Sequence, residues 1–197
     1  MADFNEKDPV VAVGEVPRQQ ARELLTNVGV DLNTTIVGLA PGSTNSRAKR
    51  WTAEGFARLN DRLQTELNVS VVLLGSAGDK EVAARVVGLA EERPHDLTGE
   101  TDISLAAGIL AEMDLLVSND MGLAHLAPAV GTKTIVIFGP TNPVTTRPFS
   151  DLATVVSAGV ECSPCMLRDC PIDHRCMTRI SADDVFERAK AILTDGQ

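Results

Sequence analysis

The stretch "DLLVSNDMGLAHLAPAVGTKTIVIFG", residues 114–139, places two apolar runs on either side of a segment with helical character. Residues 114–119 are predicted to form a buried strand, residues 121–131 a helix that ends at Gly131, and residues 133–139 a second buried strand. Two continuously apolar strands joined by a helix are typical of parallel strands covered on both faces. The stretch therefore predicts a βαβ unit.

The same alternation extends along the whole chain. Further strands are predicted at residues 35–40, 69–75 and 152–157, and further helices at 18–28, 52–67, 79–92, 102–113 and from Ser181 onward. This order predicts an α/β fold, a Rossmann-like parallel sheet with helices on both faces. We expect residues 1–16 to form an extended lead-in and residues 17–197 to form one domain.

Composition excludes several classes of function. A net charge of −9 argues against a nucleic-acid binder, which would present a basic face with stacking aromatic residues. The chain has five Phe, one Trp and no Tyr, so we expect an aliphatic core. The N-terminus lacks the pattern of a signal peptide, and no apolar run approaches the ~18 residues of a membrane span. We therefore expect a soluble, cytoplasmic protein.

Four cysteines lie close together, at Cys162, Cys165, Cys170 and Cys176, within a loop expected at residues 160–178. With His174 nearby, this spacing would suit a zinc site. Reduced thiols that pack a loop are the reading we prefer, because cytoplasmic thiols are normally reduced, and an oxidation-prone pair is a third reading. We therefore expect no metal.

Polar loops follow four of the predicted strands: "PGSTNSRAKRW", "GSAGDKE", "SNDMG" and "GPTNP". The carboxyl ends of parallel strands share one edge of a sheet, and ligands of such folds bind there. The agreement of four separate loops predicts a binding site at this edge.

The third of these loops combines Asp120, Gly122 and His125 at the start of a helix. The first turn of a helix offers unpaired N–H groups and a positive dipole end, which bind phosphate, and a glycine allows close approach to the backbone. Taken alone, Asp120 would be a helix N-cap and His125 a structural helix residue. Their combination favours a site in which Asp120 caps the helix, accepts sugar hydroxyls, or does both.

The first loop adds cations to an otherwise acidic chain. Lys49 is a suitable point charge for a diphosphate, and Ser43 and Thr44 supply hydroxyl groups. On the second loop, Asp79 and Glu81 are also explained as first-turn carboxylates favoured by the helix dipole. The G-x-G-x-x-G fingerprint is absent, which argues against an ordinary dehydrogenase.

These motifs together resemble a known family. "GLAPGSTNSRAKRWTAEGFARL", "LLGSAGDKE", "TDISLAAGILAEMDLLVSNDMGLAHLAPAVGTKTIVIFGPTNP" and "CSPCMLRDCPIDHRCMTRISADDVFERA" are similar to the C-terminal half of glycosyltransferase family 9, the ADP-heptose:lipopolysaccharide heptosyltransferases. The tail most resembles the heptosyltransferase II type. The resemblance covers roughly residues 17–195.

The resemblance implies the C-terminal, donor-binding domain of a GT-B glycosyltransferase. The family transfers heptose, with inversion, from ADP-heptose to the inner core of lipopolysaccharide at the membrane surface, which places the protein in the cytoplasm and at the inner face of the membrane. It requires no metal or other cofactor. Its donor-binding residues, carried over motif by motif, are Ser43, Thr44 and Lys49 on the phosphates, Asp79 or Glu81 on the ribose, Ile103 on adenine, Asp120 on the heptose, Met121, Gly122 and His125 around the diphosphate, and Thr141 near the site.

The family's N-terminal acceptor domain, which carries the catalytic base, has no counterpart in these 197 residues. We therefore expect no catalytic base here, only Lys49 and His125 as stabilisers of the leaving diphosphate, and the acceptor domain as a partner. Two alternatives remain open: a non-catalytic nucleotide-sugar binding module, or a sugar-nucleotide hydrolase or epimerase. The latter would need His125 or His95 as its base.

Overall fold

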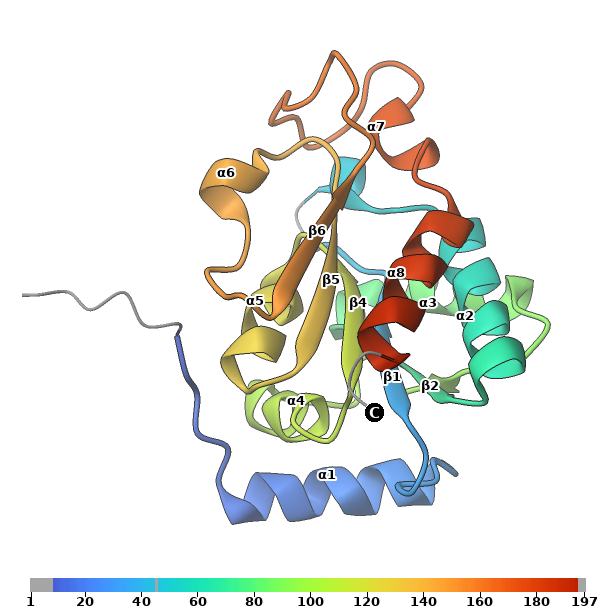
Figure 1. The fold of residues 1–197 in the computed structure, drawn as a ribbon, viewed down its shortest axis with the longest axis vertical. Helices are drawn as coiled ribbons and strands as arrows, with labels where there is room; N and C mark the ends of the chain where they lie inside the picture. Colours follow the sequence, from blue (N-terminus) through green and yellow to red (C-terminus); the bar gives the residue numbers. More distant parts are fainter. Residues whose placement is uncertain (1–8, 45, 195–197) are drawn as a thin grey trace, which may run out of the picture.

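The computed structural model describes residues 9–44 and 46–194, which contain one six-stranded parallel sheet (Figure 1). The strand order is β3-β2-β1-β4-β5-β6. The strands are β1 (Ile36–Ala40), β2 (Ser70–Leu73), β3 (His95–Asp96), β4 (Leu115–Asn119), β5 (Lys133–Phe138) and β6 (Ala153–Ser157). This is the order of the doubly wound dinucleotide-binding fold, which confirms the Rossmann-like prediction.

Helices cover both faces of the sheet, as expected. One layer contains α2 (Ala53–Leu67), α3 (Lys80–Leu89) and α8 (Ala182–Thr194), and the other contains α1 (Glu15–Asn27), α4 (Ile103–Leu110) and α5 (Gly122–Ala129). Shorter elements are η1 (Arg47–Lys49), η2 (Ala77–Asp79), α6 (Pro143–Thr146) and α7 (Arg175–Thr178). In the described part of the chain, no helix combines the length and apolar character needed to cross a bilayer.

Several predicted bounds differ from the observed ones. Helix α1 begins at Glu15 rather than at residue 18, and α5 ends at Ala129, one residue after Pro128. The helix end coincides with Gly131, whose φ of 100° turns the chain and lets the Thr132 N–H bond back to the Ala127 carbonyl. The two-residue β3 was not predicted, because it is too short to show periodicity. Of the expected extended lead-in, residues 1–8 lie outside the described residues and residues 15 and 16 belong to α1 instead, while the domain boundary after residue 16 stays a prediction.

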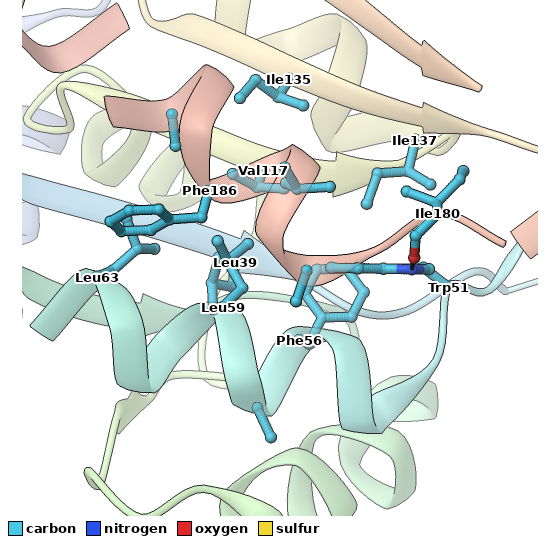
Figure 2. Close-up of a cluster of buried hydrophobic side chains, with 14 of the residues drawn as sticks. Leu39, Trp51, Phe56, Leu59, Leu63, Val117, Ile135, Ile137, Ile180 and Phe186 are labelled. Atoms are coloured by element: carbon cyan, nitrogen blue, oxygen red, sulfur yellow. Dashed lines mark hydrogen bonds between the residues drawn. The ribbon is translucent and has the colours of Figure 1, made fainter. Parts of the chain in front are cut away.

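The core is mainly aliphatic, as expected, but its part between α2 and α8 also contains aromatic side chains (Figure 2). Trp51 is 2% exposed, and its indole Nε1 donates to the carbonyl of Ile180 over 3.0 Å. Phe56 packs edge-on against it, with the ring centroids 4.9 Å apart, and Phe186 lies near Leu63. The Trp51 hydrogen bond ties the end of the first polar loop to the segment that precedes α8.

Asn119, at the end of β4, ties that loop to the neighbouring strand. Its buried side chain accepts a hydrogen bond from the Trp51 N–H at 2.9 Å. Its amide nitrogen donates to the carbonyls of Pro41 at 2.8 Å and Gly42 at 3.1 Å. The loop after β1 is thereby held across the point between β1 and β4 where the strand order reverses, which is where ligands of this fold class bind.

Candidate nucleotide-binding site

The four polar loops share one edge of the sheet, as predicted. Strands β2, β1, β4 and β5 are consecutive neighbours and all parallel, so their carboxyl ends lie side by side. Figure 1 shows this edge at the end of the molecule opposite α1.

A cavity of about 290 Å³ opens at this edge, between the β2 loop and the start of α4 and α5. It brings together four of the predicted residues: Thr44, Ile103, Met121 and Gly122. Its other walls are largely apolar and include Leu74, Ala106, Leu123 and Leu126. A mainly apolar pocket with a few polar groups is typical of a site for a small molecule.

The amino end of α5 borders this cavity and is not capped by Asp120, so the N-cap reading of that residue is wrong. The N-cap is Met121, and it makes no side-chain capping hydrogen bond. A side chain added at Gly122 would meet no atom within 4 Å, so the space beside the first turn is open. The first-turn N–H groups and the dipole therefore face an accessible space suited to an anion.

Asp120 lies beside this helix end and binds two other predicted residues. The ammonium group of Lys49 lies 3.0 Å from its Oδ2, and the hydroxyl of Thr141 donates to the same oxygen over 2.7 Å. Lys49 also donates to the backbone carbonyl of Asp120 at 3.3 Å. Asp120 is only 4% exposed, so these contacts balance a carboxylate that is largely removed from water. The structure thus joins loops after β1, β4 and β5.

The two carboxylates predicted for the ribose do not line the cavity. Asp79 is fully buried and closes a capping box, with its Oδ2 accepting from the N–H and hydroxyl of Ser76. Glu81 is exposed and borders a different cavity of about 360 Å³, beside Arg85 and His174. Ser76, which sequence reasoning missed, lines the 290 Å³ cavity instead. The ribose assignment stays a prediction.

The histidines lie away from this cavity. His125 is exposed and borders a third cavity of about 220 Å³, with Arg147 and Phe149. His95 is on the edge strand β3, where its Nδ1 lies 2.8 Å from the carbonyl of Val28. The hydrolase alternative needed one of them as a base, and neither lines the cavity.

Ser43 is buried, and its carbonyl accepts a hydrogen bond from Arg50 at 3.1 Å. Ser43 lines none of the three cavities described above, so its contact with the phosphates stays a prediction.

The cysteine-rich loop braces the segment that carries Lys49, a role with no sequence signal. The Arg168 carbonyl accepts from the Ala48 N–H at 2.9 Å and the Ser46 hydroxyl at 3.1 Å. The His174 Nε2 lies 2.6 Å from the Ala48 carbonyl. The loop therefore helps to fix η1 in place.

The four cysteines of this loop are free thiols. Burial raises the pKa of the Cys176 thiol, and the three neighbouring cysteines raise it further. Within residues 9–44 and 46–194, no group of three or more His, Cys, Asp or Glu side chains is placed to hold a metal ion.

Comparisons with known proteins agree with this geometry. A family model described as "Glycosyltransferase family 9 (heptosyltransferase)" matches residues 2–175. A "Lipooligosaccharide heptosyltransferase 2" of Campylobacter jejuni is 32% identical over 163 residues, covering 80% of this chain and 51% of the relative. A protein of the same name from Haemophilus influenzae is 38% identical over 125 residues, covering 61% of this chain and 36% of the relative.

Two solved structures share the fold. A glycosyl transferase family 9 protein from Veillonella parvula has a TM-score of 0.83 and 26% identity, and the match covers 94% of this chain and 54% of that one. The E. coli ADP-heptose lps heptosyltransferase II has a TM-score of 0.81 and 26% identity, with 95% and 54% covered. The chain thus spans about half the length of these relatives.

Proposed function

Because the chain belongs to glycosyltransferase family 9, we propose that it is the donor-binding half of a heptosyltransferase, with ADP-heptose as its donor. In this proposal, residues 17–197 form the C-terminal domain of a GT-B enzyme. The enzyme transfers heptose with inversion to the inner core of lipopolysaccharide. The relatives named as heptosyltransferases support this reading over a binding module or a hydrolase.

The observation that carries the proposal is the cavity at the strand-order reversal, bordered by an open helix start. We assign adenine to the apolar wall at Ile103, which is 79% exposed and available for contact. The diphosphate would lie at the first turn of α5, between Gly122 and Thr44. This arrangement stabilises the charge of the leaving diphosphate with N–H groups and the helix dipole.

Lys49 and Asp120 would act on either side of the bond that breaks. The ammonium group of Lys49 supplies positive charge to the departing diphosphate, and the Asp120 carboxylate accepts hydroxyl groups of the heptose. Because Thr141 also holds Asp120, the carboxylate stays oriented when Lys49 turns to the donor. His125, three residues after Gly122 on the same helix, keeps its proposed place near the diphosphate as a prediction.

The remaining parts of the reaction lie outside this chain in our proposal. An N-terminal acceptor domain would supply the catalytic base and bind the lipopolysaccharide core at the inner face of the cytoplasmic membrane. The residues above supply charge and hydrogen bonds without a metal or other cofactor. The net charge of −9 fits a sugar-nucleotide enzyme better than a nucleic-acid binder.

Thermal unfolding in the presence of ADP, ADP-heptose, UDP and UDP-glucose tests the donor site. A ligand at one hundred times its Kd adds about 2.7 kcal/mol of stability. We expect such a shift with the two adenine compounds, its loss in Lys49→Ala, and its retention in Lys190→Ala, a lysine of α8 remote from the cavity. Equal shifts with the uridine compounds, or none with any nucleotide, would contradict the proposal.

A further inference from the structure

We propose that Arg50 and Asp79 form a positioning pair that aims the backbone of the loop after β1 at the donor phosphates. This inference rests on the proposed function of the 290 Å³ cavity. Neither side chain lines that cavity: Asp79 is fully buried, and Arg50 borders the 360 Å³ cavity at α2 and α3.

Asp79 holds Arg50 through a buried charge. Its Oδ2 is engaged by Ser76, at 3.0 Å from the N–H and 2.7 Å from the hydroxyl. Its Oδ1 is buried and has no hydrogen-bond partner among the described residues, and the Nη2 of Arg50 lies 3.8 Å away from it. A buried carboxylate oxygen is costly unless a positive charge faces it, so this oxygen favours one position of the guanidinium group.

Arg50 in turn holds the loop. The same Nη2 donates to the Ser43 carbonyl over 3.1 Å. The Asp79 carboxylate also lies directly against the loop backbone, since a Cβ added at Gly42 would be 2.2 Å from its Cγ. The pair therefore supports the loop both by a hydrogen bond and by close packing.

The contacts made by the carbonyls of this loop determine the direction in which the N–H groups of Ser43 and Thr44 point. In a trans peptide, the carbonyl of one residue and the N–H of the next point in opposite directions. Arg50 fixes the Ser43 carbonyl, and Asn119 fixes the Gly42 carbonyl at 3.1 Å. The N–H groups of Ser43 and Thr44 consequently point away from those donors. Because Thr44 lines the cavity, we place these N–H groups toward the phosphates.

Two consecutive basic residues thus have different tasks. Lys49 faces Asp120 at the site and contacts the donor directly, whereas Arg50 faces Asp79 and acts through the loop. If Arg50 bound the phosphates directly, removal of the Asp79 charge would leave ADP binding unchanged or tighter. The positioning role predicts weaker ADP binding, and this contrast provides the test.

Isothermal titration calorimetry with ADP would compare Asp79→Asn, Arg50→Met and Arg50→Lys with wild type. We expect Asp79→Asn and Arg50→Met each to weaken binding on the order of tenfold, because small displacements of positioning groups have effects of this size or larger. Arg50→Lys should recover part of the loss. Arg58→Met, an exposed arginine paired with Asp183 on the same layer, should bind like wild type. Unchanged or tighter binding by Asp79→Asn would overturn the proposal, because it would mean that Asp79 restrains a direct ligand.

The double variant Arg50→Met/Asp79→Asn separates positioning from charge compensation. It leaves no unpaired buried charge, so we expect its urea midpoint to recover relative to Arg50→Met while ADP binding stays weak. If both the urea midpoint and ADP binding recovered, the proposal would be overturned, because the pair would then contribute only to stability.

Amide hydrogen exchange in the absence of ADP supplies a readout that does not depend on the donor. We expect faster exchange at residues 42–44 in Asp79→Asn and Arg50→Met, with β1 and β4 unchanged. If wild type failed to bind ADP, the proposed function would fall, and this exchange would still decide whether the pair holds the loop. Unchanged exchange would refute the pair's role.

Discussion

The ammonium group of Lys49 lies 3.0 Å from Oδ2 of Asp120, although the two residues are 71 positions apart in the chain. The pair joins the loop after β1 to the end of β4, across the point where the strand order reverses. The side chain of Lys49 is 27% exposed and that of Asp120 5%, so the site combines a buried acceptor with a cation that a ligand can reach. In the proposed function, this cation turns from its carboxylate partner to the diphosphate of the donor.

Replacing Lys49 by Ala should destabilise the ligand-free protein by about 1 to 2 kcal/mol, because Asp120 is left buried without its counter-charge. The partial exposure of Lys49 makes the cost smaller than for a fully buried pair. Urea denaturation measures the difference. The double variant Lys49→Ala/Asp120→Asn should recover part of the loss. A double variant less stable than the single one would show that the charge is not the cause.

Thr141→Val should destabilise the protein by about 1 to 2 kcal/mol, since it removes a hydroxyl donor from a buried carboxylate while keeping the side-chain shape. It should also weaken ADP-heptose binding more than ADP binding, because Asp120 is assigned to the sugar. Calorimetry with both ligands checks the second point. Thr154→Val, on the edge strand β6, provides the control. Equal losses for the two ligands would argue against a sugar contact.

Gly122→Ala should leave the stability of the ligand-free protein unchanged, whereas Gly42→Ala should lower it. A Cβ at Gly122 meets nothing within 4 Å, so the empty protein should keep its stability, yet ADP should bind less tightly if phosphate approaches this backbone. A Cβ at Gly42 would overlap Asp79, which should cost about 1 to 3 kcal/mol or more. Thermal unfolding with and without ADP measures both. If Gly122→Ala bound ADP as tightly as wild type, the proposed position of the phosphate at the first turn of α5 would be contradicted.

Cys176 should make stability depend on pH in the alkaline range. Burial raises its pKa above the ordinary value of 9.0, so above about pH 9 the unfolded chain releases a proton that the folded protein retains. The free energy of unfolding therefore falls as pH rises through this range. We expect a smaller fall between pH 7.5 and 9.5 in Cys176→Ala than in wild type, measured by urea midpoints. The exposed Cys165→Ala should behave like wild type, and identical curves for all three proteins would contradict the expectation.

Local sequence order was enough to predict the fold class and the edge of the sheet where the polar loops meet. Each of the four central strands is a continuous apolar run followed by polar residues, and both features depend on local sequence order alone. Parallel packing then requires those polar ends to meet. For the same reason, the positions of Thr44 and Gly122 at this edge follow from the order of residues along the chain, whereas Ile103 was placed near the site only by the family resemblance.

The contacts of each polar side chain, in contrast, could be known only from the packed fold. Lys49 and Arg50 are adjacent in sequence, yet one faces Asp120 and the other Asp79. The burial of Asp79, the bracing of η1 by the cysteine-rich loop, and the two-residue β3 also depend on segments far apart in the chain. Hydrogen bonds and ion pairs act over a few ångströms, so which groups they join depends on where the packed elements place those groups, and a local pattern of residues does not contain that information.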